Sequence, residues 1–116
     1  MNLKEKISTV INQYGNVEFS AKSIQNANAC AELFSNELNS LFSVMVSGSD
    51  IHYIEFYYDD ELLYVDISFD DTSTSIYCRK KSDKFPHSDN EFFTDNVPIK
   101  EIYEIINGLM SFRKNT

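Results

Sequence analysis

The fold of this chain is decided by residues 51–80, which read IHYIEFYYDDELLYVDISFDDTSTSIYCRK. Apolar and polar side chains alternate through this stretch, and pairs of aspartates interrupt the alternation twice. Alternation with a period of two is typical of half-buried β-strands, and aspartates favour the turns between strands. The pattern therefore predicts three antiparallel strands, at Ile51–Tyr58, Glu61–Phe69 and Thr72–Lys80, joined by turns at Asp59-Asp60 and Asp70-Asp71.

The register of these two hairpins can be tested on the sequence. Two-residue loops at the aspartate pairs place Phe56 opposite Leu63, and Val65 opposite Ile76. One face of all three strands is then apolar. A slip by one residue would mix the two faces, whereas a four-residue loop at the first turn would leave them unchanged. We therefore expect one apolar sheet face that packs on helices.

Helical segments are predicted before the three strands. The first runs from Leu3 to Tyr14, between a capping Asn2 and a helix-ending Gly15. A second helix follows an extended link at residues 17–19, is capped by Ser20 and continues to about Phe42. Residues 43–46 either extend that helix or form a short edge strand.

The C-terminal part is predicted to be a long loop followed by a helix. Residues 81–97 show no periodicity, and aromatic side chains including Phe92 and Phe93 can pin them to the core. Pro98 suits the first turn of the last helix. The resulting fold is α+β in one domain, residues 1–116: two N-terminal helices, a three-stranded antiparallel meander with a possible short fourth strand, a long loop and a C-terminal helix.

The composition limits the classes of partner. The 116 residues include 18 acidic and 10 basic ones, for a formal net charge of −8. Such a charge repels phosphate backbones and anionic membranes, so we expect neither nucleic acid nor a membrane as a direct partner. The N-terminus is too polar for a signal peptide, and we expect a cytoplasmic protein unless a partner exports it.

No motif predicts a metal, a cofactor or enzyme activity. Cys30 and Cys78 form no C-x-x-C pair and are expected to be buried thiols, with a contact between them left open. His52 is expected on the core face, partly buried, and no histidine spacing matches a zinc site. The adjacent acids at the turns lack the alternate spacing and central glycine of a calcium loop.

The polar face of the strands is the candidate site. Tyrosines from all three strands lie there with carboxylates between them, and the window from Asp50 to Asp71 contains no Lys or Arg. Tyrosine provides a large, stiff contact area, and carboxylates steer a basic partner. Two simpler interpretations are that a helix covers this face, or that its charges only keep it solvated. We predict a docking surface made of Tyr53, Glu55, Tyr57, Asp59, Asp60, Tyr64, Asp66 and Tyr77.

These features predict a small inhibitory binding protein. In size, acidity and absence of motifs the chain is similar to bacterial immunity proteins, although it matches no family motif. The similarity implies that it neutralises a cognate basic toxin or nuclease by direct binding. Either a monomer or a homodimer is compatible with the sequence. The alternatives are an acidic nucleic-acid mimic that inhibits a DNA- or RNA-binding protein, a secretion or assembly chaperone, and an enzyme with an unrecognised site.

Overall fold

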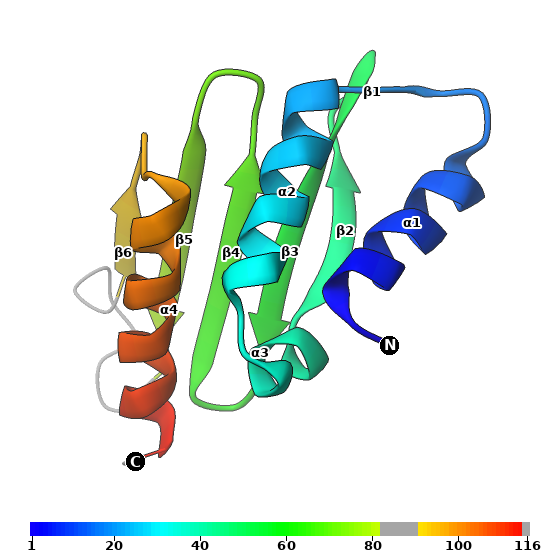
Figure 1. Ribbon diagram of the computed structural model, residues 1–116. Helices are drawn as coiled ribbons and strands as arrows, with labels where there is room; N and C mark the ends of the chain where they lie inside the picture. Colours follow the sequence, from blue (N-terminus) through cyan, green and yellow to red (C-terminus); the bar gives the residue numbers. More distant parts are fainter. Residues whose placement is uncertain (82–90, 115–116) are drawn as a thin grey trace.

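The computed structural model describes residues 1–81 and 91–114, without the side chains of residues 112–114. In this part of the chain, four helices pack on one face of a six-stranded mixed sheet (Figure 1). The predicted α+β class is confirmed. The three predicted antiparallel strands are present, but they are part of a larger sheet that also contains a parallel pair, so the sheet is not a three-stranded meander. The helices are α1 (Leu3–Tyr14), α2 (Ala21–Leu33), α3 (Asn36–Leu41) and α4 (Ile99–Lys114); the strands are β1 (Glu18–Phe19), β2 (Ser43–Ser47), β3 (Ile51–Asp59), β4 (Leu63–Phe69), β5 (Thr74–Lys80) and β6 (Glu91–Thr94).

Strand β3 pairs with three other strands. Strands β2 and β4 run antiparallel to it, and the short β1 runs parallel to its first residues, with Glu18 opposite Ile51. Strands β5 and β6 continue the antiparallel sheet beyond β4. Of the two alternatives for residues 43–46, a helical extension or a strand, the structure shows the strand, β2. Part of the expected long loop forms strand β6. Residues 82–90 of that loop lie outside the described residues.

Both hairpins turn later than predicted. The Asp60 backbone N–H donates to the Leu63 carbonyl at 3.0 Å, and the Asp70 N–H donates to the Ser73 carbonyl at 2.9 Å. The two-residue loops are thus residues 61–62 and 71–72 rather than the two aspartate pairs. The physical reason is that aspartate favours the first position of a turn, where its carboxylate can accept the N–H groups that follow.

This displacement leaves the two sheet faces as predicted. Phe56 pairs with Ile67 instead of Leu63, and Val65 pairs with Cys78 instead of Ile76. Both shifts span an even number of residues, so every side chain keeps its face. The apolar face is buried throughout, through Ile54, Phe56, Tyr58, Leu63, Val65, Ile67, Phe69, Ile76 and Cys78.

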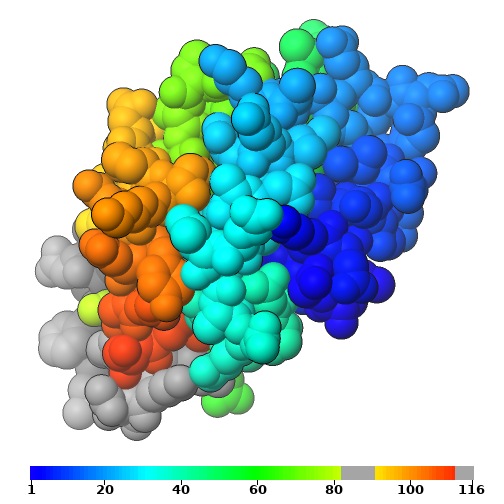
Figure 2. All heavy atoms as spheres, viewed as in Figure 1, coloured from blue at the N-terminus to red at the C-terminus, as the bar shows by residue number. Residues whose placement is uncertain are grey.

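The helices pack on that apolar face (Figure 1). Helix α2 lies against β3 and β4, α1 lies against β2, and α4 packs beside α2. Figure 2 views the molecule from this side, where the helices hide most of the sheet. Cys30 and Cys78 are free thiols buried in the core, as expected, and burial raises the pKa of Cys30 to about 12.

The second helix is shorter than predicted. Helix α2 ends at Leu33, and Phe34 then adopts an extended backbone with φ −75° and ψ 142°. Ser35 begins the separate helix α3, because its side chain accepts the Leu38 N–H at 3.2 Å. The break brings the Phe34 and Phe42 rings together in the core, with centroids 5.6 Å apart.

Asn39 joins this break to the N-terminal helix. Its amide nitrogen lies 3.2 Å from the carbonyl oxygens of both Ala31 and Phe34, where α2 ends. Its side-chain oxygen accepts the Leu3 backbone N–H at 2.9 Å. One side chain therefore satisfies backbone groups that helix ends leave without an intrahelical partner.

Replacing Asn39 by alanine should lower the free energy of unfolding by about 2 kcal/mol, because several partly buried backbone groups lose their partner. The matched control is Asn36→Ala in the same helix, whose exposed side chain should contribute less than about 0.5 kcal/mol. Urea unfolding followed by circular dichroism measures both. Equal effects of the two substitutions would contradict the bridging role of Asn39.

Candidate functional site

The sheet face opposite the helices carries the residues predicted to bind a partner. We call it the open face, because none of the described helices covers it (Figure 1). Strand alternation and register define its members. They are Ser43, Met45 and Ser47 on β2, Tyr53, Glu55, Tyr57 and Asp59 on β3, Tyr64, Asp66 and Ser68 on β4, Ser75, Tyr77 and Arg79 on β5, and Glu91 and Phe93 on β6.

One row of side chains crosses the middle of the open face. Successive Cα pairings place Ser43, Tyr57, Asp66, Tyr77 and Phe93 side by side on five strands. Neighbours in such a row have Cβ atoms about 5 Å apart. A carboxylate is therefore flanked by a tyrosine on each side. The side chain of Phe93, 64% exposed, extends the aromatic surface toward the β6 edge.

Asp66 and Glu55 form the acidic centre of the open face. The Ser68 hydroxyl lies 2.7 Å from a Glu55 oxygen and 3.3 Å from an Asp66 oxygen. The Tyr64 hydroxyl donates to the other Asp66 oxygen at 3.1 Å. Burial, followed by the hydrogen bond with Glu55 and the negative charge of Glu55, raises the pKa of Asp66 to about 6. The ionised form of Asp66 is therefore costly in the isolated protein.

No ion pair in the described part of the chain neutralises this acidic centre. The two ion pairs found there join Lys4 to Glu32, between helices α1 and α2, and Lys81 to Asp59 at the end of β3. At the β4–β5 turn, burial raises the pKa of Asp70, and the charges of neighbouring carboxylates raise it further. The acids of this surface thus repel one another, and a positively charged partner would relieve that repulsion.

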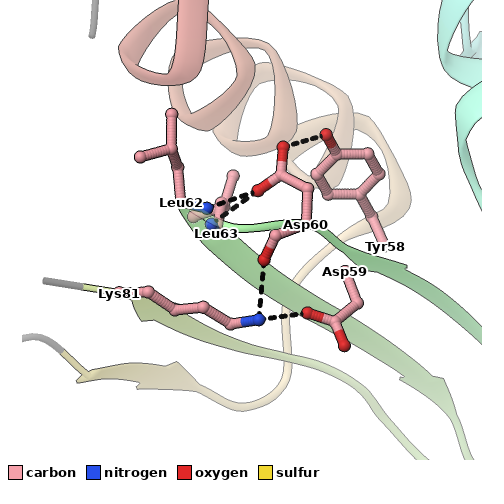
Figure 3. Close-up of polar contacts among 6 residues, drawn as sticks. All are labelled: Tyr58, Asp59, Asp60, Leu62, Leu63 and Lys81. Atoms are coloured by element: carbon pink, nitrogen blue, oxygen red, sulfur yellow. Dashed lines mark hydrogen bonds and ion pairs between the residues drawn. The ribbon is translucent and has the colours of Figure 1, made fainter.

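Asp59 and Asp60 are adjacent but differ in environment (Figure 3). One Asp60 oxygen accepts the backbone N–H groups of Leu62 and Leu63 at 2.7 and 2.8 Å. The other accepts the hydroxyl of the buried Tyr58. Asp60 is therefore bonded inside the hairpin, and the structure does not bring it to the open face.

Lys81, directly after β5, holds the same hairpin (Figure 3). Its ammonium group binds the Asp59 carboxylate and lies 2.6 Å from the Asp60 carbonyl oxygen. Its backbone N–H donates to the Leu62 carbonyl at 2.8 Å. Asp59 thus lies at the border of the open face, already paired with a cation. A shallow hollow of about 230 Å³ beside it is lined by Asp59, Tyr64, Tyr77, Arg79 and Lys81.

The structure brings all the predicted docking residues except Asp60 onto one surface, and it adds residues that sequence reasoning missed. Met45 joins from β2, opposite Glu55, and Phe93 and Glu91 join from β6. The run from Phe92 to Thr94 consists of residues with strong strand propensity, which is the signal that could have indicated β6.

Among residues 1–81 and 91–114, no three His, Cys, Asp or Glu side chains converge as metal ligands would. The His52 ring packs against Tyr14 and Phe19, at centroid distances of 5.7 and 5.8 Å, and these two rings also contact each other. In the same part of the chain, no helix combines the length and the apolar character needed to cross a membrane.

Comparisons with known proteins place the chain in no family. No protein-family model matches the sequence, and neither the curated proteins nor the solved structures contain a match. The geometry and charge of the open face are therefore the observations on which a function can be proposed.

The hairpin contacts of Asp60 predict a large effect of Asp60→Ala on stability. The substitution leaves two backbone N–H groups and the buried Tyr58 hydroxyl without this acceptor, and should lower the free energy of unfolding by about 2 kcal/mol or more. The exposed Glu61 at the next position is the control, and Glu61→Ala should change it by less than about 0.5 kcal/mol. Urea titration compares the free energies of unfolding of the two variants. An Asp60→Ala variant as stable as the wild type would refute the role of Asp60 in the hairpin.

The raised pKa of Asp66 predicts that Asp66→Asn affects stability in a pH-dependent way. Because the folded-state pKa of about 6 exceeds the ordinary 3.8, the wild type loses stability as the pH rises through that range. The asparagine side chain can still accept the hydrogen bond from the Tyr64 hydroxyl, but it never ionises. With allowance for solvent screening, the free energy of unfolding of Asp66→Asn relative to the wild type should rise by about 1 kcal/mol between pH 4 and pH 7.5. Urea unfolding at both pH values tests this, and an unchanged difference would contradict it.

Proposed function

We propose that this protein is an inhibitory binding protein that neutralises a basic toxin or nuclease with its open face, as bacterial immunity proteins neutralise their toxins. The observation that carries the proposal is the central row, in which Asp66 lies between Tyr57 and Tyr77 on a sheet face that none of the described helices covers. Interfaces concentrate binding energy in a few aromatic anchors surrounded by polar groups. The open face offers such anchors together with Asp66 and Glu55, which form no ion pair with another described residue.

The charge of the protein supports a basic partner. The net charge of −8 would accelerate association with a positively charged protein, and salt would weaken that attraction. The same charge disfavours nucleic acid as a direct partner. An acidic mimic of nucleic acid would use the same face. It is distinguished from an inhibitor of the immunity-protein kind because nucleic acid would compete with it for binding to the partner.

A second candidate is a secretion or assembly chaperone, which the exposed aromatic side chains of β6 favour. Phe92 and Phe93 are 46% and 64% exposed. A chaperone of this kind binds an extended segment through apolar surface, and is usually a dimer. Light scattering after size-exclusion chromatography separates the candidates. A 1:1 complex with a folded basic protein supports the inhibitor, whereas a dimer holding an unfolded segment supports the chaperone.

The test of the inhibitor begins with capture of the partner from host extract at low salt. The purified partner is then titrated with wild type and variants by calorimetry, and its own activity is measured with and without the protein. Tyr57→Ala and Tyr64→Ala should weaken binding about tenfold or more, because they remove central aromatic contacts. Asp59→Ala should weaken it less than about threefold, because Asp59 is an exposed border residue paired with Lys81.

The control for this experiment lies on the helix side of the molecule. Leu33 on α2 is 45% exposed, and Leu33→Ala should leave binding unchanged. If Leu33→Ala weakened binding as much as Tyr57→Ala, the partner would occupy the helix side. That result, or a captured partner whose activity the protein does not reduce, would refute the proposal.

A further inference from the structure

At the centre of the open face, one carboxylate has three tyrosines as neighbours. Tyr57 and Tyr77 are the cross-strand neighbours of Asp66 on its two sides. Tyr64 donates its hydroxyl to Asp66, and its ring meets the Tyr77 ring edge-on at a centroid distance of 6.0 Å. Rings beside a carboxylate attract a cation in two ways, because the ring face and the carboxylate oxygens are both negative.

A second carboxylate, that of Glu55, lies next to Asp66. Glu55 shares the Ser68 hydroxyl with Asp66, so the two carboxylates lie within reach of one ligand. A planar guanidinium has five N–H donors, stacks on aromatic rings and binds carboxylates in pairs. A lysine ammonium is a compact, strongly hydrated charge that stacks poorly. The arrangement therefore suits arginine better than lysine.

We infer that the open face binds an arginine side chain of the partner between Tyr57 and Tyr77, with the guanidinium paired to Asp66 and Glu55. The inference rests on the proposed function, since it specifies which residue a basic partner presents. It also explains what relieves the repulsion between the two carboxylates when the partner is bound. The desolvated Asp66 then gains a charge-assisted hydrogen bond, and the guanidinium offsets the neighbouring negative charge of Glu55.

Arginine binding at this place requires ionised Asp66, whose pKa burial raises to about 6. Protonation of Asp66 below that pH removes the negative charge that attracts the guanidinium. The affinity for arginine should therefore fall as the pH falls through about 6. The titratable or charged groups around Asp66 on the three packed strands are Glu55 and Tyr57 on β3, Tyr64 on β4, and Tyr77 and Arg79 on β5.

Short peptides provide the probe, used with the full chain at low salt. They are hexa-arginine, hexa-lysine of equal charge, and uncharged hexa-citrulline, which keeps the arginine shape. Calorimetry gives the affinities, and amide chemical shifts locate the binding surface. We expect hexa-arginine to bind about tenfold more tightly than hexa-lysine, with shifts on β3, β4 and β5, and hexa-citrulline not to bind.

Two substitutions, each of which removes one negative charge, distinguish binding at Asp66 from a general attraction between the acidic protein and a basic peptide. Asp66→Asn should weaken hexa-arginine binding about tenfold and abolish its loss between pH 7.5 and pH 5.5. Glu104→Gln, on an exposed part of α4 on the helix side, should change the affinity less than about twofold. Thermal unfolding verifies that both variants are folded. The pH dependence of hexa-arginine binding to the wild type is a second test that does not depend on any variant.

The outcomes distinguish this inference from the proposed function. Equal affinities for the arginine and lysine peptides, with equal effects of the two substitutions, would overturn the arginine site but leave a face that attracts basic proteins. No binding of either peptide at millimolar concentration would also overturn the arginine site. Shifts confined to the helix side would overturn both the arginine site and the placement of the docking surface.

Discussion

Strand β3 is the element on which the rest of the sheet depends, because β1, β2 and β4 all pair with it. Its alternation is the governing constraint. Ile54 and Phe56 are fully buried under the helices, so the residues between and beside them must point the other way. Core packing on one side thereby sets the positions of Glu55 and Tyr57 on the open face. No contact within the open face is needed to align these two side chains.

The helices are tied to the core side by buried polar contacts as well as by apolar packing. The Ser23 hydroxyl of α2 accepts the Ile54 backbone N–H at 2.8 Å, and the Ser20 N–H donates to the His52 carbonyl at 2.9 Å. The Ser20 hydroxyl also binds Asp71 in the β4–β5 turn. Because buried polar groups need partners, these bonds specify where α2 lies on the sheet. Because of that placement, α2 does not cover the open face.

The open face carries an electrostatic cost that the fold itself does not require. Hydrophobic or neutral polar residues at positions 55 and 66 would avoid both the burial of a carboxylate and its repulsion by Glu55, which raise the pKa of Asp66. Local features that lower stability without a structural return are typical of functional sites. This cost, together with the flanking tyrosines, supports a partner that supplies positive charge. The internal bonds of Asp60 show the contrast, because that acid stabilises its own hairpin.

By itself, the sequence determined which strand residues are buried, because a period of two is a local pattern that survives even shifts of register. It also determined helix α1, between Asn2 and Gly15. It could not place the turns, since moving an aspartate from the middle to the start of a turn keeps the same faces. Only the tertiary structure decided that Asn39 of α3 joins the end of α2 to Leu3 of α1, that the described helices share one side, and that β6 brings Phe93 beside Tyr77. These features depend on contacts between segments far apart in the chain, which no local pattern encodes.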